Sequence, residues 1–348
     1  MKGLRKYLTP FAPDQSGAVS VLYELGGILV ICDAGGCTGN VCGFDEPRWF
    51  SHKSGVFSAG LRDMDAILGR DDKLVAKLED AAGKLDASFA AVIGTPVPSV
   101  IGTDYQALRR MAERKLDLPV LTVDTTGMEL YDVGEEKAYL ELFRRFAVDS
   151  CPVEPGRIGV LGVTPLDMSD LRAGERITAV LREQGWHTVD CYGMGAGLDR
   201  VCSAAGAEKN LVVSPAGLKA AQYLKDTFGT PYEIDDPLAP ALLPEGDFTG
   251  RRVLVIHQQV TANALRTVLE QRGSGEVTVA TWFLKKAALA RPGDIALKEE
   301  DQFVDLVHRG GYDIIIGDGV LHRMIPDFAG QFVEAPHFAV SGTLEGRP

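Results

Sequence analysis

The chain reads Ile28-Leu-Val-Ile-Cys-Asp-Ala-Gly-Gly-Cys-Thr-Gly-Asn-Val-Cys-Gly43 near its start, an apolar run followed by a glycine-rich loop. A short apolar run that ends in glycines is typical of a buried strand. Open α/β sheets place their ligands at the carboxyl ends of the strands. Gly35, Gly36 and Gly39 let the backbone approach a bulky group and offer N–H donors to it. We therefore expect a binding site in this loop.

Three of the six cysteines fall in or beside the loop, at Cys32, Cys37 and Cys42. Cysteine thiolates are the usual ligands of iron–sulfur clusters. The spacing Cys-x4-Cys-x4-Cys does not match the zinc ribbons, and disulfides are disfavoured in a cytoplasmic chain. The pattern therefore favours an iron–sulfur cluster. Cys32 has an alternative reading, as a small core residue at the end of a strand.

Beyond the loop, apolar strand-like runs alternate with amphipathic helical patterns over the whole chain, which predicts parallel sheets of the α/β type. Two linker-like stretches, 151–156 and 235–250, divide the pattern. We expect three Rossmann-like domains, at residues 1–150, 151–240 and 241–348. Within them, Ser169 is expected to start a helix, and the run Phe338–Val340 is expected to be a strand.

The composition limits the classes of function. The net charge of −12 argues against a nucleic-acid partner, because phosphate binding needs clustered Lys and Arg. No apolar run has the roughly 18 residues of a membrane span, and the N-terminus lacks the apolar core of a signal peptide, so we expect a cytoplasmic protein that does not bind membranes.

Nucleotide-binding motifs are missing as well. The sequence has no Gly-x4-Gly-Lys-Ser/Thr motif, so we expect no nucleotide bound by this chain through a P-loop. The glycines of Gly193-Met-Gly-Ala-Gly197 follow a strand-like run, but Leu198 stands where a dinucleotide loop has its third glycine. A tight turn is therefore the better reading.

The order of elements around the loop resembles the nitrogenase component 1 superfamily. In that family a helix leads into a strand and then a Gly-Cys loop, as Ser16–Leu25, Ile28–Ile31 and Asp33–Cys37 do here. The loop Gly94–Asp104 and the stretch Tyr312–Asp318 are similar to later family segments. The resemblance implies an α/β fold of three Rossmann-like domains with parallel sheets and the role of a nitrogenase-like oxidoreductase component.

The cysteines depart from the family pattern. Relatives with an intersubunit cluster usually supply three cysteines per subunit, and only Cys37 matches one of them; Ala12 and Pro96 stand near the other two positions. Ser214 stands where the nitrogenase cofactor-binding subunit has a cofactor cysteine, so the large molybdenum cofactor is not expected.

Other side chains of the loop extend the predicted ligand set. Cys32 and Cys42 are additional thiols, and Asp33 is a possible ligand because a carboxylate replaces one cysteine in some relatives. Two copies of the loop would supply enough thiolates for a [4Fe–4S] cluster between subunits. The predicted metal ligands are Cys37, Cys42, Cys32 and Asp33.

The resemblance also implies partners. We expect a homodimer, or a heterodimer with a paralogous subunit, that receives electrons from an ATP-dependent iron–sulfur reductase protein and reduces a substrate between the domains. One alternative is a non-catalytic scaffold or carrier of a metallocluster, or a partner subunit of a catalytic paralogue. Another is a metal-free Rossmann-like protein that binds a small ligand.

Three histidines are candidate proton donors, because histidine titrates near neutral pH. His257 ends a strand-like run, His337 follows Ala335-Pro336, and His52 follows the cysteine loop. A single histidine is more often hydrogen-bonded in a structural role or exposed, and that reading stays open for each of them.

Overall fold

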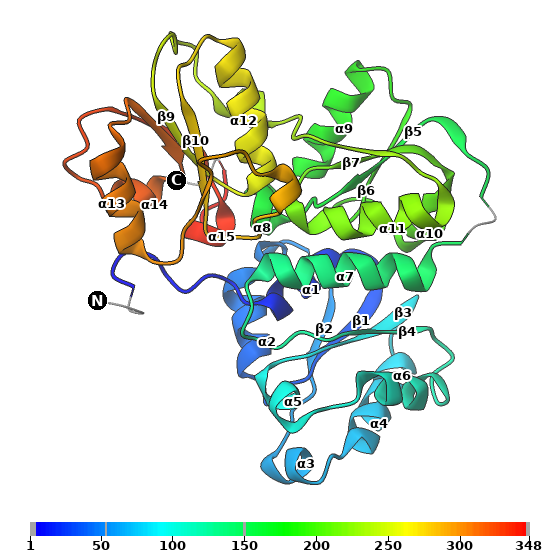
Figure 1. Cartoon of the computed structure of the whole chain (residues 1–348). Coiled ribbons are helices and arrows are strands. Elements are labelled where there is room, and N and C mark those ends of the chain that lie inside the picture. Colours follow the sequence, from blue (N-terminus) through cyan, green and yellow to red (C-terminus); the bar gives the residue numbers. More distant parts are fainter. Residues whose placement is uncertain (1–4, 53, 149–150, 346–348) are drawn as a thin grey trace.

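The computed structural model describes residues 5–52, 54–148 and 151–345. Its strands form three sheets, in the orders β2-β1-β3-β4, β6-β5-β7-β8 and β11-β10-β9-β12-β13 (Figure 1). All strand pairs within these sheets are parallel. The predicted α/β class is therefore confirmed. Each of the three expected domains contains one sheet, while their boundaries stay a prediction.

The N-terminal sheet carries the cysteine loop. Its strands are β1 (Gly27–Ile31), β2 (Gly55–Ser58), β3 (Phe89–Ile93) and β4 (Val120–Val123). Its helices are α1 (Asp14–Leu22), α2 (Gly36–Asn40), α3 (Asp63–Ile67), α4 (Asp71–Ala82), α5 (Pro96–Ile101), α6 (Tyr105–Glu113) and α7 (Tyr131–Phe146). A π-helical turn at Val41–Asp45 and a 3₁₀ turn at Pro47–Phe50 continue from α2.

The middle and C-terminal sheets repeat this arrangement. The middle one has β5 (Glu154–Leu161), β6 (Thr188–Cys191), β7 (Ala207–Val212) and β8 (Tyr232–Ile234), with α8 (Pro165–Met168), α9 (Ala173–Glu183), α10 (Leu198–Cys202) and α11 (Leu218–Phe228). The C-terminal one has β9 (Val253–Ile256), β10 (Val277–Thr281), β11 (Ile295–Ala296), β12 (Ile314–Gly317) and β13 (Gln331–Glu334), with α12 (Gln259–Gln271), α13 (Glu300–Gly310), α14 (Gly319–His322) and α15 (Phe338–Ser341).

Strand β1 is apolar along its whole length because both of its faces are covered. Successive side chains of a strand point to opposite faces. Leu29 and Ile31 pack in the core that contains α1 and α7, whereas Ile28 and Val30 pack in the core that contains α4 and α6. This burial fixes the position of the strand end from which the cysteine loop starts.

Helix α7 joins the N-terminal and middle sheets (Figure 1). Its side chains Tyr139, Leu142 and Phe143 belong to one buried cluster that contains Leu29 of β1 and Leu161 of β5. A second cluster joins Phe11 of the N-terminal segment to the C-terminal sheet. Helix α7 and the N-terminal segment therefore connect the three sheets through buried contacts.

Two local predictions were wrong. Phe338–Val340 lies in helix α15, because an apolar run of three residues does not distinguish a strand from a helix; Gly342 ends this helix in the left-handed region. Ser169 does not start a helix. It follows α8 with a φ of 54°, and its hydroxyl accepts the Phe338 N–H at 2.5 Å.

Among the residues that the structure describes, no helix combines the length and apolar character required to cross a membrane.

Candidate functional site

The cysteine loop is shaped by Asp33. Its carboxylate accepts the Thr38 N–H at 2.7 Å, the Thr38 hydroxyl at 3.0 Å and the Ser58 hydroxyl at 2.6 Å. Gly35 has a φ of 117°, which favours glycine, and helix α2 starts immediately after it. Asp33 is buried and both of its oxygens are engaged. It would have to give up these hydrogen bonds to bind a metal, so its evident role is to hold the loop.

Cys32 lies in the core beneath the loop. Its side chain is 3% exposed and belongs to the buried cluster that includes Ala59 and Leu74. Burial, together with the charges of Asp71 and Asp33, raises the pKa of the Cys32 thiol to about 12. The thiol therefore stays protonated at neutral pH. This geometry matches the alternative reading of Cys32 as a core residue.

Cys37 and Cys42 are placed differently. Cys37 is in α2 and Cys42 is in the π-helical turn, a structure that is frequent at functional sites, and both are half-buried free thiols. Burial raises the pKa of each thiol, and the charge of Asp33 contributes to both shifts. A bound metal would have to stabilise their ionised forms.

The glycines beside these thiols leave room for a bound group. No described heavy atom lies within 4 Å of the position that a Cβ would take at Gly36 or Gly39, neighbours aside. Over the described ranges, no set of three His, Cys, Asp or Glu side chains is arranged to hold a metal ion. One chain thus presents two accessible thiols, Cys37 and Cys42, rather than a complete ligand set.

The residues at the other family ligand positions have roles in the fold. The Ala12 carbonyl accepts the Tyr131 N–H at 2.9 Å. Pro96 is the first residue of α5, and Ser214 is buried, with its hydroxyl accepting the Ala216 N–H at 3.3 Å.

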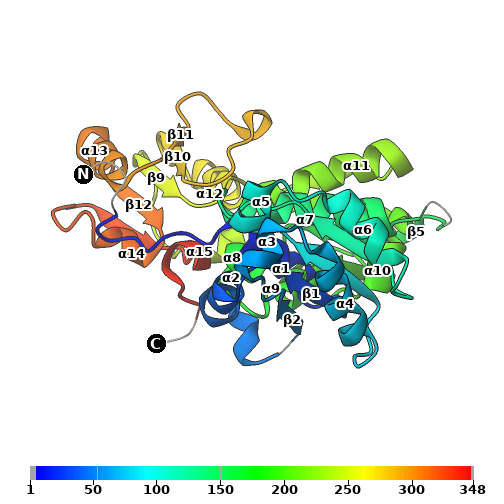
Figure 2. The ribbon, with the colours of Figure 1, turned by 90° about the horizontal axis from the view of Figure 1, so that it is seen from below.

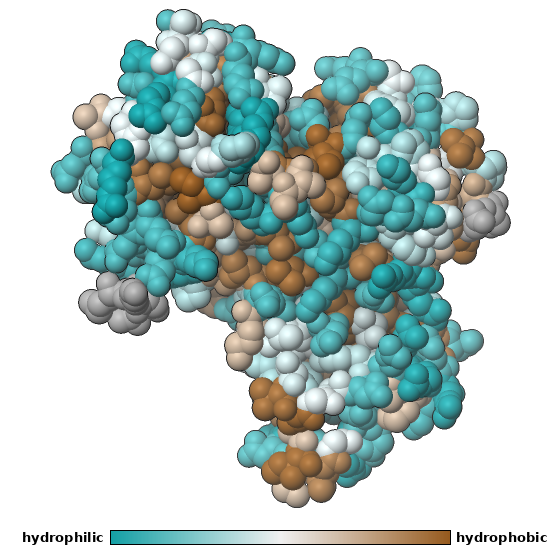
Figure 3. Space-filling model, viewed as in Figure 1, coloured by the Kyte–Doolittle hydropathy of each residue, from teal (hydrophilic) through white to brown (hydrophobic). Residues whose placement is uncertain are grey.

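Exposed apolar side chains gather on two helices beside the N-terminal sheet and on the turns after Cys42. Helices α3 and α5 pack against each other and expose the side chains of Met64, Ile67, Leu68, Val97, Val100 and Ile101, which form a hydrophobic patch (Figure 3). Phe44 and Phe50, which follow Cys42, are 75% and 69% exposed. Exposed apolar surface of this extent is typical of an interaction site.

Arg48 ties the loop to the middle domain. It is buried, and its guanidinium donates to Glu46 at 2.7 Å, to Glu24 at 2.9 Å and to the Gly193 carbonyl at 2.8 Å. The Gly195 N–H donates to the other oxygen of Glu24 at 2.9 Å. The turn Gly193–Gly197 therefore makes a contact between domains, in agreement with its reading as a tight turn.

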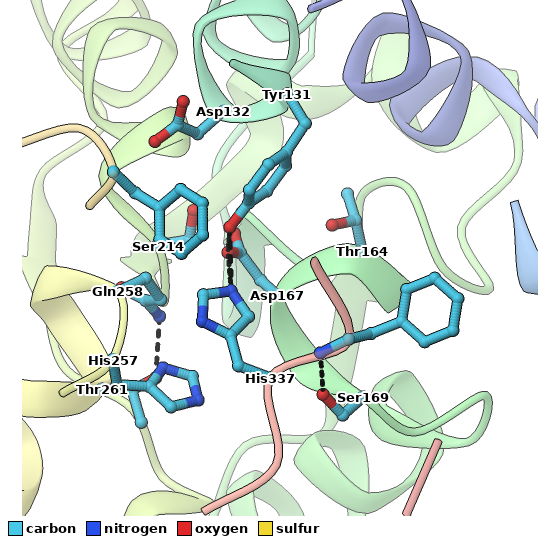
Figure 4. A network of polar contacts seen from close by, with 12 residues as sticks. Tyr131, Asp132, Thr164, Asp167, Ser169, Ser214, His257, Gln258, Thr261 and His337 are labelled. Carbon is cyan, nitrogen blue, oxygen red and sulfur yellow. Dashed lines mark hydrogen bonds and ion pairs between the residues drawn. The ribbon is translucent and has the colours of Figure 1, made fainter. Parts of the chain in front are cut away.

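A polar cluster lies where the three domains meet (Figure 4). The Tyr131 hydroxyl donates to Asp167 Oδ1 at 2.6 Å and lies 2.9 Å from His337 Nε2. Because the single hydroxyl proton goes to Asp167, His337 Nε2 must be the donor to Tyr131. The three residues are buried and come from separate elements: Tyr131 from α7, Asp167 from α8 and His337 from the segment before α15.

His257 extends this cluster. Its ring stacks on that of His337, with centroids 4.4 Å apart and an interplanar angle of 11°. Its Nε2 donates to the Pro336 carbonyl at 3.2 Å, while the Nδ1 atoms of both rings have no hydrogen-bond partner among the described atoms. Burial, together with the charge of His337, lowers the pKa of His257 to about 3. His257 is therefore neutral at physiological pH.

Two carboxyl groups share the same interior. Burial raises the pKa of Glu135 well above its ordinary value, and the charge of Asp167 adds to this. Burial also disfavours ionised Asp167, but hydrogen bonds from His337 and Tyr131 outweigh it, so its pKa is lowered. Burial thus favours the protonated form of Glu135, whereas the neighbours of Asp167 favour its ionised form. Buried neighbouring groups whose pKa values are shifted in opposite directions are typical of functional sites.

Sequence reasoning found part of this cluster. The structure brings His257 and His337 together, whereas His52 lies apart with an exposed side chain, and its carbonyl accepts the Tyr23 hydroxyl at 2.7 Å. Asp167 and Tyr131 were missed. Asp167 follows the carboxyl end of β5, so the rule that selected the cysteine loop could have selected it too.

Comparisons with known proteins agree on one family. Over 179 residues the chain is 26% identical to the nitrogenase iron-molybdenum cofactor biosynthesis protein NifE of Clostridium pasteurianum, a match that spans 51% of this chain but only 38% of that relative. The solved structure of nitrogenase Cp1 at pH 6.5 aligns with a TM-score of 0.74 at 12% identity and covers 97% of this chain and 87% of its own. The structure at pH 5 gives a TM-score of 0.69 at 14% identity, with 97% and 85% coverage.

The structural matches, at these identities, establish a shared fold. The sequence match to a family model goes further, because it covers more than half of the chain, residues 15–242. The chain belongs to the nitrogenase component 1 type oxidoreductase family.

Proposed function

We propose that this chain is a nitrogenase-like oxidoreductase component that holds an iron–sulfur cluster at a dimer interface. The observation that carries the proposal is the pair of half-buried thiols, Cys37 and Cys42, on a glycine-flanked surface. Two copies of the chain, or one copy and a paralogous subunit, would together supply four thiolates, the number that a [4Fe–4S] cluster needs. When bound, such a cluster supplies one-electron transfer.

The residues of the loop would have different roles. Cys37 and Cys42 would bind the iron. Asp33 and Cys32, which are also among the predicted metal ligands, would instead support the loop. The Asp33 carboxylate is engaged by three donors, and the Cys32 thiol is packed in the core. Gly35, Gly36 and Gly39 would let the backbone approach the cluster.

The proposal includes an electron donor. Because the sequence has no P-loop, ATP would be used by a separate iron–sulfur reductase protein rather than by this chain. The exposed apolar patch on α3 and α5 supports a contact with a protein partner near the cluster loop. Tyr131, Asp167 and His337 would hold a proton close to the site of reduction.

A large cofactor buried at the three-domain junction does not fit this chain. Tyr131, Phe283 and His337 contact one another there. The described cavity that borders Asp167 and His257 has a volume of only about 30 Å³, which is room for about one water molecule.

A second candidate function is a scaffold or carrier for a metallocluster, or a partner subunit of a catalytic paralogue. The similarity to a cofactor biosynthesis protein favours it. So does the small number of thiols that one chain presents, because a carrier must release its cluster as well as bind it.

The first experiment measures iron and sulfide, with EPR of the dithionite-reduced protein, after anaerobic purification. Cys37→Ala and Cys42→Ala should lose the iron and the signal. Cys202→Ala is the matched control, because it removes another half-buried cysteine far from the loop in the sequence, and it should keep both. Wild-type protein that stays iron-free after reconstitution, both alone and with a paralogous subunit, would contradict the oxidoreductase and the cluster-scaffold functions.

A second experiment separates the two candidates. The loaded protein is mixed with a purified iron–sulfur reductase, ATP and a candidate substrate, or with an apo-acceptor protein. Substrate reduction that depends on Cys37 supports the oxidoreductase. Transfer of iron to the acceptor without turnover supports the scaffold.

A further inference from the structure

A groove lies between helix α4 and the edge of the N-terminal sheet, with a volume of about 310 Å³. Strand β2 is an edge strand of this sheet and pairs with β1. Figure 2 shows α4 beside β2. The volume is at the lower end of the range for small-molecule sites, roughly 300–1,000 Å³. None of the predicted metal ligands is among the described residues that line the groove, so it is a separate site.

Apolar side chains from three elements form most of the groove. On α4, Leu74, Leu78 and Ala81 follow one another at helical spacing, so they lie on one face of the helix. Val30 of β1 and Phe57 of β2 are partners in the parallel register, and both line the groove. Leu78 is buried, whereas Phe57 is 40% exposed. The groove is therefore an apolar trough that is open to solvent on one side.

The groove also carries charge. Its described charged lining residues are Lys77, Asp80 and Lys84. Lys84 Nζ lies 2.7 Å from the Asp80 carboxylate, so these two charges offset each other. Lys77 donates instead to the carbonyl of Ala59, directly after β2. An ammonium group has three donors, and this carbonyl takes one of them. Lys77 therefore brings a positive charge to the groove, with hydrogen bonds left to give to an anion.

These features select a ligand with two parts. The apolar walls favour an alkyl chain, because a polar group buried against them would lose its hydrogen bonds to water. Leu74 and Ala81 are about 10 Å apart along the helix axis, so an elongated chain fits better than a compact group. A single carboxylate is the matching head group for one ammonium.

We propose that this groove binds a medium-chain fatty acid. The alkyl chain lies between α4 and β2, and the carboxylate accepts hydrogen bonds from Lys77. The test of this proposal needs neither an iron–sulfur cluster nor a partner subunit. Iron content is measured separately, so failure of the fatty-acid site and failure of the proposed function are distinct results.

The probe is decanoate, titrated into the wild-type chain by calorimetry and compared with decanol. We expect one decanoate per chain. An apolar surface alone would prefer decanol, because the carboxylate loses more hydration on binding. The wild type should instead prefer decanoate by about tenfold, the magnitude of a hydrogen bond to a charged group. Lys77→Met keeps an unbranched apolar side chain without the charge and should prefer decanol.

A matched pair of variants tests the position of the ligand. Ala81→Trp fills the groove and should weaken decanoate binding at least tenfold. Ala76→Trp makes the same change at an exposed position of α4 outside the groove, and it should leave binding unchanged. Lys77 is exposed, so Lys77→Met keeps the proposal testable if Ala81→Trp does not fold.

Three results would overturn the proposal. The first is a wild type that does not bind decanoate or that prefers decanol, because Lys77 would then select no carboxylate. The second is decanoate binding that survives both Lys77→Met and Ala81→Trp, or that falls equally in Ala76→Trp, because the ligand would then lie elsewhere. The third is a dimer, measured by sedimentation, that excludes decanoate and dissociates in Ala81→Trp, because a second copy of the chain would then occupy the groove.

Discussion

His257 is buried against the ring of His337, and its replacement should change how the stability of the protein depends on acid. The pKa of His257 is about 3 in the folded protein because burial disfavours the charged ring. In the unfolded chain a histidine has a pKa of about 6.5. Between these values the unfolded chain binds the proton and the folded protein does not. This residue therefore costs the folded state stability as the pH falls below about 6.5.

The magnitude follows from the two pKa values. Each pH unit below 6.5 costs about 1.4 kcal/mol until the folded pKa is reached. Between pH 8 and pH 5, His257 should therefore lower the free energy of unfolding by about 2 kcal/mol. His257→Gln keeps an amide that can reach the Pro336 carbonyl but removes this titration.

The assay is urea unfolding of chelator-treated protein at pH 8.0, 6.5 and 5.0, followed by circular dichroism. The loss of stability between pH 8 and pH 5 should be about 2 kcal/mol smaller in His257→Gln than in the wild type. The exposed His308→Gln is the control and should follow the wild type. Parallel pH profiles for the wild type and His257→Gln would refute the reasoning, because His257 would then be charged or hydrated in the folded protein.

Three further predictions concern other buried charges. Burial raises the pKa of Asp132 to about 7, so this residue should lower the free energy of unfolding by about 2 kcal/mol as the pH rises from 5 to 7. Asp132→Asn should remove this contribution, so the difference between variant and wild type should change by about 2 kcal/mol over that range in the same urea series. Arg48→Met leaves Glu46 buried without its partner and should lower the free energy of unfolding by about 3–5 kcal/mol, measured by calorimetry. The double variant with Glu46→Gln should recover part of this loss. An unchanged Tm in Arg48→Met would contradict this account. The Glu300 carboxylate accepts hydrogen bonds from the N–H groups of residues 6, 7 and 8. Glu300→Gln should therefore speed tryptic cleavage after Lys6 severalfold. Equal cleavage rates in variant and wild type would show that other contacts hold this segment.

The parts of the fold that the sequence predicts are those set by local pattern. The apolar run that became β1 has both faces covered, so its hydrophobicity is continuous and easy to recognise. No strand-like run in the sequence marks the short edge strands β8 and β13, because their burial alternates weakly and their pairing depends on neighbours distant in the sequence. The same applies to Phe338, whose helix is fixed by a contact with Ser169.

The candidate site is likewise only partly predictable from the sequence. Glycines and cysteines mark the loop in the sequence, but the difference between Cys32 and Cys37 depends on burial, which the spacing does not contain. The cluster of Tyr131, Asp167 and His337 draws one residue from each domain, at positions with no shared motif. Only the packing of three sheets brings them together. The metal ligands themselves stay a prediction.

The hydrogen bonds between Glu300 and the N-terminal segment affect the order in which parts of the chain fold. Lys6, Tyr7 and Leu8 are translated 292 to 294 residues before the carboxylate that accepts their N–H groups. Contacts of such long sequence separation form slowly. The first described part of the chain to be synthesised therefore reaches its final place among the last, and Phe11 beside it must remain without its Trp282 and Phe283 neighbours until the C-terminal sheet has been made.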